Sequence, residues 1–176
     1  MYTAEAVKPD TGRQQPVTEP RTPEDVQAAL DALGLDIRVR IFETSTATAQ
    51  EAADSVGTEL GSIVKSLCFL VGGEPVIVLA AGDQKVDARK LGALFGVSRK
   101  KVRIADAQTT LEATGYEPGG VPPVGHVRPL PILIDETLSR FEIVYGAAGS
   151  PRAIFEIPFK TLVEITGGRV ADLAKE

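Results

Sequence analysis

Residues 62–81 have the sequence SIVKSLCFLVGGEPVIVLAA, which predicts the centre of the fold. Two apolar runs rich in β-formers, 62–71 and 74–81, flank the dipeptide Gly72-Gly73. Two such runs separated by a pair of glycines are typical of a β-hairpin, because glycine tolerates the positive φ angles of a two-residue turn. We therefore expect a hairpin over residues 62–81.

Helix and strand signals stand on both sides of this hairpin. Thr22-Pro23-Glu24-Asp25 combines an N-cap threonine, a proline at the first helical position and acidic residues in the first turn. Apolar spacing and caps predict helices over 23–33, 48–56, 88–95, 107–113 and from Pro158 onward. Alternation predicts strands over 37–41, 132–134, 141–145 and 153–157. Ile41 would face inward in the first of these strands, and Phe95 would face the core in helix 88–95.

Hairpins and helices follow one another irregularly, unlike the strict strand–helix alternation of a doubly wound sheet. We therefore predict an α/β (mixed α+β) fold, a single domain over 22–176 with a central mixed, curved β-sheet flanked by helices. Residues 1–21 hold Pro9, Pro16 and Pro20 and almost no large apolar residue. Such a segment cannot bury enough surface to offset its ordering entropy, so we expect a disordered N-terminal tail.

Composition excludes several classes of function. The 176 residues contain no run of about 18 apolar residues, so no membrane partner is expected. The net charge of −5 argues against a protein that coats DNA in bulk. One cysteine, Cys68, and one histidine, His126, cannot make an internal disulfide or a Cys/His zinc site. We expect no metal, no cofactor and a cytoplasmic location.

Lys65 is an unusual residue within its strand. The two-residue period places it on the same face as Ile63, Leu67 and Phe69, with Ser66 and Cys68 on the other face. An ammonium on an apolar face must reach water, an anion or an acceptor. Lys65 is therefore either a cation at the mouth of a pocket or a lysine that extends to solvent from the end of the strand.

Two loops rich in small residues are candidates for pocket walls. Residues 119–126 read GGVPPVGH, in which glycines allow close approach of a ligand to the backbone amides and prolines stiffen the loop. Residues 146–151 read GAAGSP and could form the opposite wall. A plain tight turn is the alternative interpretation of each loop.

Familiar nucleophile arrangements are missing from the sequence. It contains no G-x-S-x-G motif, and Cys68 lies in an apolar run where a free cysteine is usually inert. His126 could act as a base, although no acid is evident to orient it. Asp135 follows a predicted strand and is interpreted as the cap of the next turn.

Basic residues gather between positions 85 and 103. Seven of them surround a single acid, Asp87, namely Lys85, Arg89, Lys90, Arg99, Lys100, Lys101 and Arg103. This segment is either a surface that contacts phosphates or a solvated surface balanced by acids elsewhere.

The strand around Lys65, the sequence Lys85-Val86-Asp87, the loop 119–126, Ile134-Asp135 and residues 145–151 together resemble the YbaK family. This family includes the editing domain of bacterial prolyl-tRNA synthetases and free-standing relatives. The similarity covers residues 24–174. It implies hydrolysis of the ester that joins a wrong, small amino acid (such as alanine or cysteine) to tRNA.

The resemblance also implies roles for individual residues. Lys65 would contact the tRNA 3′ end near the ester, and Gly119, Gly120 and Gly125 would present backbone amides to the carbonyl. The pocket would be formed by Val121, Pro122, Pro123, His126, Gly146, Ala147 and Gly149. Water, assisted by a hydroxyl of the terminal ribose, would attack the ester.

Partners follow from the same resemblance. Aminoacyl-tRNA is the expected substrate, an aminoacyl-tRNA synthetase is a second expected partner, and Lys85, Arg89, Lys90, Lys100 and Lys101 are candidates for tRNA contact. The alternative is a non-catalytic module that binds a nucleotide or the tRNA 3′ end.

Overall fold

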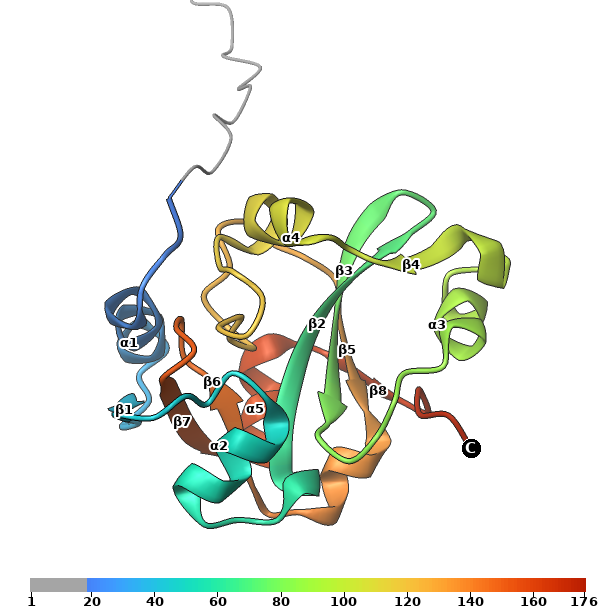
Figure 1. The fold of residues 1–176 in the computed structure, drawn as a ribbon. Helices are drawn as coiled ribbons and strands as arrows, with labels where there is room; N and C mark the ends of the chain where they lie inside the picture. Colours follow the sequence, from blue (N-terminus) through green and yellow to red (C-terminus); the bar gives the residue numbers. More distant parts are fainter. Residues whose placement is uncertain (1–18) are drawn as a thin grey trace, which may run out of the picture.

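The computed structural model describes residues 19–176 and contains the predicted hairpin as β2 (Ile63–Val71) and β3 (Glu74–Ala81) (Figure 1). The two strands pair antiparallel from Val71↔Glu74 to Val64↔Ala81. Gly72 and Gly73 have φ angles of +58° and +85°, the left-handed conformation that a two-residue hairpin turn requires. The sequence prediction of the hairpin is confirmed.

The other edge of β2 is shared by two strands that leave a gap between them. β6 (Ile143–Ala147) pairs parallel with β2 at Ile63 and Val64. β4 (Val102–Ile104) pairs antiparallel with the far end of β2, from Phe69 to Val71. Residues 65–67 therefore pair with neither strand, whereas the Cys68 carbonyl accepts the N–H of Ala105, just after β4, at 2.9 Å. This gap positions the site described below.

The remaining strands extend the sheet on both sides. β7 (Ala153–Pro158) pairs antiparallel with β6, and β1 (Arg40–Ile41) pairs antiparallel with β7. On the other side, β5 (Ile132–Asp135) pairs parallel with β3, and β8 (Arg169–Ala171) pairs parallel with β5. The order is β1-β7-β6-β2-β3-β5-β8 with β4 added to β2, which confirms the predicted mixed sheet.

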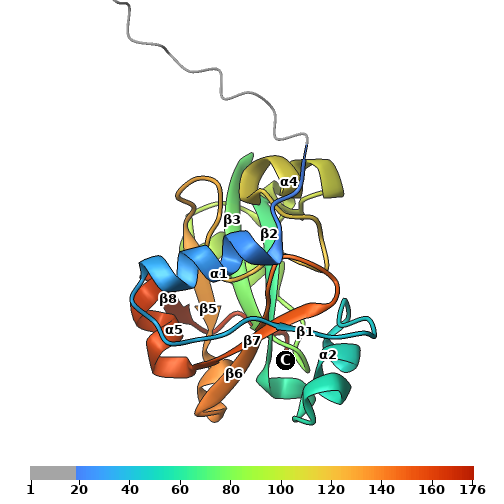
Figure 2. The same ribbon diagram turned by 90° about the vertical axis from the view of Figure 1, so that its left-hand side faces the viewer.

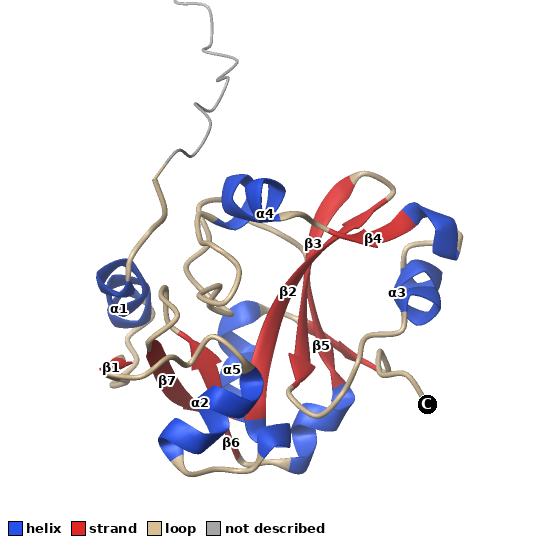
Figure 3. Ribbon diagram, viewed as in Figure 1, coloured by secondary structure: helices blue, strands red, loops and turns tan. Residues whose placement is uncertain are grey.

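Helices cover both faces of the sheet (Figure 3). α1 (Pro23–Ala32), α4 (Ala107–Thr114) and α5 (Phe159–Thr166) contribute to the larger core, and α1 crosses in front of the sheet in Figure 2. On the opposite face, α3 (Ala88–Leu94) packs Leu91 against the β2–β3 hairpin. α2 (Ala49–Val56) packs Ala52 and Ala53 near Ile63 at the start of β2.

Two predictions about the periphery are wrong. The strand expected over 37–41 is reduced to Arg40–Ile41, and Ile41 is 65% exposed. The Gln27 side chain replaces a strand partner here, because its amide donates to the Ile37 carbonyl and accepts the Val39 N–H, both at 2.9 Å. Phe95 is 39% exposed rather than buried, because α3 ends at Leu94 and Phe95 follows as its C-cap.

Residues 1–18 of the predicted tail lie outside the described residues. Within the tail's last residues, the Arg21 N–H donates to the Gly115 carbonyl at 2.8 Å. Over residues 19–176, no helix combines the length and apolar character needed to cross a membrane.

Candidate functional site

A pocket of about 230 Å³ lies at the gap between β6 and β4. Its walls come from β2, from the segment that leads into α2, from the glycine–proline loop and from β6 and β7. The lining residues are Thr46, Ala47, Thr48, Ala49, Ala52, Ile63, Val64, Lys65, Ser66, Leu67, Gly119, Val121, Tyr145, Gly146, Ala147 and Ile154. Four segments distant in sequence thus meet where β2 has no neighbouring strand.

Lys65 provides the positive charge of this pocket. Its ammonium donates to the Gln84 carbonyl, which is its single hydrogen-bond partner within residues 19–176. Partial burial lowers the pKa of Lys65, nearby Lys85 lowers it further, and Asp83 opposes the shift. Asp83 is itself held by the Arg140 guanidinium through contacts of 2.8 and 3.0 Å. An ammonium has three N–H donors, so Lys65 retains donors for a phosphate or a carbonyl oxygen.

Two buried hydroxyl groups line the pocket without a partner. Neither Thr46 Oγ1 nor Ser66 Oγ has a hydrogen-bond partner in the described part of the chain. A buried polar group without a partner costs about 1–3 kcal/mol, so a polar ligand group is the natural complement of each hydroxyl. Neither residue was predicted from the sequence to be a site residue. Ser66 was assigned to the face opposite Lys65, and the gap beside β2 cannot be read from the sequence.

The glycine–proline loop reaches the pocket at two of its residues. Gly119, with a φ of +88°, and Val121 both line the cavity. Within residues 19–176, neither of their backbone amides has an acceptor. The Gly120 N–H instead donates to the Glu117 carbonyl at 3.0 Å, so it is not free for a substrate. Gly119 and Val121 are therefore the better candidates for binding a carbonyl oxygen.

Several other predicted site residues support the walls and do not line the cavity. The Gly120 carbonyl accepts the Gly149 N–H at 2.9 Å, and a Cβ added at Gly120 would lie 3.0 Å from the Ser150 nitrogen. A Cβ at Gly146 would lie 3.0 Å from Pro123 Cδ. Small residues at these positions allow the two loops to pack closely, which brings Gly146 and Ala147 to the pocket.

The end of the loop is fixed away from the cavity. His126 Nε2 lies 2.7 Å from the Pro122 carbonyl, and since a carbonyl can only accept, Nε2 donates. Burial lowers the pKa of His126, which favours the neutral ring. The Gly125 carbonyl accepts the Tyr116 hydroxyl at 3.2 Å. Pro122, Gly125 and His126 therefore lie outside the pocket lining and hold the loop in shape.

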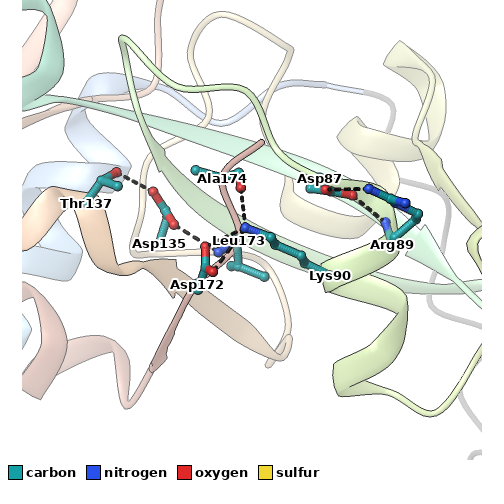
Figure 4. A network of polar contacts seen from close by, with 8 residues as sticks. All are labelled: Asp87, Arg89, Lys90, Asp135, Thr137, Asp172, Leu173 and Ala174. Carbon is teal, nitrogen blue, oxygen red and sulfur yellow. Dashed lines mark hydrogen bonds and ion pairs between the residues drawn. The ribbon is translucent and has the colours of Figure 1, made fainter. Parts of the chain in front are cut away.

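Two further ionisable side chains, those of Cys68 and Asp135, are buried in the fold and do not line the pocket. Cys68 is buried on the face of β2 opposite Lys65, and burial raises the pKa of its thiol. Asp135 is buried and accepts hydrogen bonds from the Leu173 N–H at 3.0 Å and from the Thr137 hydroxyl of the following turn (Figure 4). Asp135 therefore also anchors the chain at Leu173.

The predicted tRNA-contacting residues do not all line one cavity. Arg89 and Lys90 line a second groove beside α3, whereas Lys100 and Lys101 line neither cavity. Lys90 donates to the Asp172 carboxylate at 2.9 Å and to the Ala174 carbonyl at 2.7 Å (Figure 4). Lys85 is exposed and lies near enough to Lys65 to affect its pKa.

The residues that line the pocket carry one ammonium, and they include two backbone amides and two hydroxyls without a hydrogen-bond partner within residues 19–176. Among the described residues no Asp, Glu or His lines the pocket. Thr48 is engaged as the cap of α2, since its hydroxyl accepts the Glu51 N–H and donates to the Glu51 carboxylate, both at 3.1 Å. Across residues 19–176 no group of three or more His, Cys, Asp or Glu side chains is arranged to hold a metal ion. This arrangement can bind an anion and polarise a carbonyl, and it places no general base beside the unpartnered hydroxyls.

Comparison with known proteins finds a family and several relatives to which this chain is similar. The family described as "Aminoacyl-tRNA editing domain" matches residues 43–165. "Uncharacterized protein YwhH" of Bacillus subtilis is 39% identical over 137 residues, which cover 77% of this chain and 85% of that protein. "Putative Cys-tRNA(Pro)/Cys-tRNA(Cys) deacylase EbsC" of Enterococcus faecalis is 29% identical over 128 residues, 72% of this chain and 76% of that protein.

A solved structure is similar over most of the chain. It is described as the "Crystal structure of a putative trans-editing enzyme for prolyl tRNA synthetase". It superposes with a TM-score of 0.82 at 41% identity and covers 88% of this chain and 97% of its own. The similarity in fold thus extends well beyond the hairpin and the pocket.

Proposed function

The chain belongs to the aminoacyl-tRNA editing domain family, and from this membership we propose that it is a trans-editing hydrolase. Its substrate is a mischarged aminoacyl-tRNA that carries a small amino acid, and its partner is the synthetase that produces this error. Relatives named as a Cys-tRNA deacylase and as a trans-editing enzyme for prolyl tRNA synthetase support the proposal. The observation that carries it is Lys65, which places an ammonium in a small pocket beside free backbone amides.

The proposed reaction is hydrolysis of the aminoacyl ester. The oxygen of a water molecule forms a bond to the carbonyl carbon, and the bond from that carbon to the ribose oxygen breaks. The ribose oxygen takes up one proton of that water, the second proton passes to solvent, and the amino acid leaves as a carboxylate. Because an aminoacyl ester is already activated, positioning and stabilisation of the oxyanion supply much of the needed acceleration.

Lys65 and the loop amides would stabilise the substrate at different atoms. The Lys65 ammonium would contact the 3′-terminal phosphate or the ester, and the Gly119 and Val121 N–H groups would donate to the developing oxyanion. Loss of one oxyanion donor typically costs about 10²–10³ in kcat. The other predicted residues of the loops 119–126 and 146–151 would hold these groups in position.

The attacking water needs a proton acceptor, and we propose that a hydroxyl of the terminal ribose assists it. This assignment fits a pocket whose described lining has no acidic side chain and no histidine. The substrate would then supply the group that positions its own attacking water.

Pocket size would select the amino acid. At about 230 Å³ the cavity is below the range of roughly 300–1,000 Å³ that is common for drug-sized ligands. Ala47, Ala49, Tyr145 and Ile154 close it around a small side chain of the alanine or cysteine type. One methylene changes the binding free energy by only about 1–3 kcal/mol in such a pocket, so aminoacylation alone discriminates poorly between amino acids of similar size. A second site that hydrolyses the products small enough to enter it corrects these errors.

The test is a deacylation assay over a panel of mischarged tRNAs with wild type, Lys65→Ala and Lys160→Ala. Lys160 is an exposed lysine of α5 that does not line the pocket, so its removal controls for loss of one charge. We expect wild type and Lys160→Ala to release one small amino acid and Lys65→Ala to lose most of this activity. Tight binding of tRNA without hydrolysis by wild type would instead favour the non-catalytic binding module.

A further inference from the structure

A second groove, of about 920 Å³, lies beside the far end of β2. Its apolar floor includes Phe69, Val86 and Val102, and its rim is charged. Five basic side chains line it against two acidic ones: Arg89, Lys90, Arg99, Arg103 and Lys175 against Asp87 and Glu176. This excess is opposite to the net charge of −5 of the whole chain.

The basic side chains of the groove differ in whether they form ion pairs or hydrogen bonds with other groups of the protein. Lys90 is held by Asp172 and the Ala174 carbonyl (Figure 4). Arg89 is 80% exposed, and its guanidinium lies 3.7 Å from the Asp87 carboxylate. Arg99 and Arg103 are exposed and have no ion pair within residues 19–176. These two guanidinium groups are thus available to an external anion.

The pocket and the groove both lie along β2 and have no lining residue in common. Leu67 lines the pocket and Phe69 lines the groove. The two residues are separated by one residue in the strand, so they share a face and their Cα atoms are about 7 Å apart. Lys65 precedes them on the same face, and Lys85 lies near Lys65. Arg103, which pairs with Leu70 in the β2–β4 register, and Arg99 lie toward the other end of β2 from Lys65.

We infer that this groove binds the phosphates of the acceptor end of the RNA whose terminal ester occupies the pocket. The inference rests on the proposed function and names the surface that holds the substrate. Arginine matches phosphate with a fork of N–H donors, which suits Arg99 and Arg103. The groove's aromatic residue, Phe69, is 8% exposed and cannot stack on bases, so contact would be to the backbone and independent of sequence.

This assignment separates residues that the sequence grouped together. Arg99, Lys100 and Lys101 form one 3₁₀ helix, and Arg103 follows in β4. Arg99 and Arg103 line the groove, whereas Lys100 and Lys101 do not. The chain thus offers two pairs of exposed cations, close in sequence and equal in charge, that differ in whether they face the groove.

The experiment measures binding of uncharged tRNA as a function of salt for wild type, Arg99→Gln/Arg103→Gln and the control Lys100→Gln/Lys101→Gln. If both arginines contact phosphates, the first variant lowers the slope of log K against log salt by about 1.4–1.8. We expect the control variant to keep the slope of the wild type. Equal losses in both variants, or an unchanged slope in the arginine variant, would overturn the inference.

A second measurement keeps this inference distinct from the proposed function. An aminoacyl-adenosine ester has the scissile bond but no phosphate for the groove arginines, so the arginine variant should hydrolyse it at the rate of the wild type. A wild type that hydrolyses neither tRNA nor this ester would refute the proposed function, while the two slopes would still decide whether the groove binds phosphates. Loss of short-ester hydrolysis in the arginine variant would show that the groove arginines act on the pocket itself and would overturn the inference.

Discussion

The ammonium of Lys65 donates a hydrogen bond to the backbone carbonyl of Gln84, in the connection that follows β3. The Gln84 N–H in turn donates to the Ala81 carbonyl at 3.0 Å, so the acceptor belongs to a hydrogen-bonded turn at the end of the hairpin. β2 carries Lys65, and the turn after β3 provides the Gln84 carbonyl that orients the Lys65 ammonium. The β2–β3 hairpin therefore both builds the sheet and aims Lys65 into the pocket.

We predict that kcat/KM falls as pH rises through the lowered pKa of Lys65, below its usual value of 10.5. In the proposed mechanism the Lys65 side chain contacts the substrate as a protonated ammonium, so we expect activity to be present below the folded pKa and lost above it. The measurement is a pH profile of deacylation corrected for spontaneous ester hydrolysis. In Lys65→Arg, whose side chain stays charged, the alkaline limb should disappear.

Stability gives an independent check of the same pKa. Between the lowered folded pKa and 10.5, the unfolded chain binds more protons than the native protein. The free energy of unfolding from this group therefore rises with pH across that window. Lys65→Met should lack this contribution, and identical alkaline stability profiles for the two proteins would contradict the lowered pKa.

The unpartnered hydroxyls of Thr46 and Ser66 predict a loss of activity with little loss of stability. Neither Thr46→Val nor Ser66→Ala removes a hydrogen bond within the described protein, so we expect unfolding free energies within about 1 kcal/mol of wild type. If each hydroxyl binds substrate, kcat/KM should fall by about 2–10-fold, which corresponds to about 0.5–1.5 kcal/mol.

Thr114→Val is the matched control for these two variants. The buried Thr114 hydroxyl donates to the Thr110 carbonyl at 2.7 Å and accepts the Tyr116 N–H at 3.1 Å, outside the pocket. This variant should lose stability and keep kcat/KM at temperatures well below its midpoint. The opposite pattern, with stability lost in Thr46→Val and activity retained, would assign Thr46 a purely structural role.

Local sequence signals predicted the parts of the fold whose stabilising groups are close in the chain. The Gly72-Gly73 turn joins its own two strands, and Asp87 caps its own helix by accepting the Arg89 N–H at 2.9 Å. β4 and β8 have three residues each and are stabilised by distant partners, β2 and β5. Strands this short have too few residues to show a reliable alternation, so the sequence alone did not indicate them.

The same distinction holds for the site. Lys65 stood out because an ammonium among apolar residues of one face conflicts with burial, and this conflict is visible in a strand by itself. The significance of Thr46 and Ser66 depends on where β6 and β4 leave β2, which is set by tertiary structure. The sequence singled out the loop 119–126 as a candidate, and packing decides that Gly119 and Val121 line the cavity and His126 does not.

Gly120→Ala should damage both stability and activity. The added Cβ would lie 3.0 Å from the Ser150 nitrogen and 3.1 Å from the Gly149 carbonyl carbon, and backbone atoms there cannot move independently. Overpacking of this kind costs about 1–3 kcal/mol, and it would shift Gly119 within the pocket. Unfolding and deacylation measured on the same preparation test this prediction.

Gly96→Ala provides the comparison. Gly96 has a φ of +67°, and a Cβ there would meet no heavy atom within 4 Å, so the substitution strains the backbone without crowding it. We expect a loss of about 1–2 kcal/mol in stability and an unchanged kcat/KM. If Gly120→Ala also kept kcat/KM, the contact between the two loops would not position the catalytic groups.

The last prediction concerns Asp135, whose carboxylate connects β5 to the chain after β8. It is 1% exposed and accepts the Leu173 N–H, while the Leu173 carbonyl accepts the Asp87 N–H at 2.7 Å. Asp135→Ala would leave the Leu173 N–H and the Thr137 hydroxyl without their acceptor in the interior. We expect a loss of about 2–4 kcal/mol in unfolding free energy, measured by denaturant titration.

Asp172→Asn removes the neighbouring exposed ion pair with Lys90 and leaves the buried Asp135 carboxylate in place, so it tests the ion pair alone (Figure 4). Because solvent screens an exposed pair, its loss should change unfolding little. Both variants should retain kcat/KM well below their midpoints, since neither residue lines the pocket. Equal destabilisation by the two substitutions would mean that the exposed pair contributes as much as the buried carboxylate to holding the chain at Leu173 against the sheet.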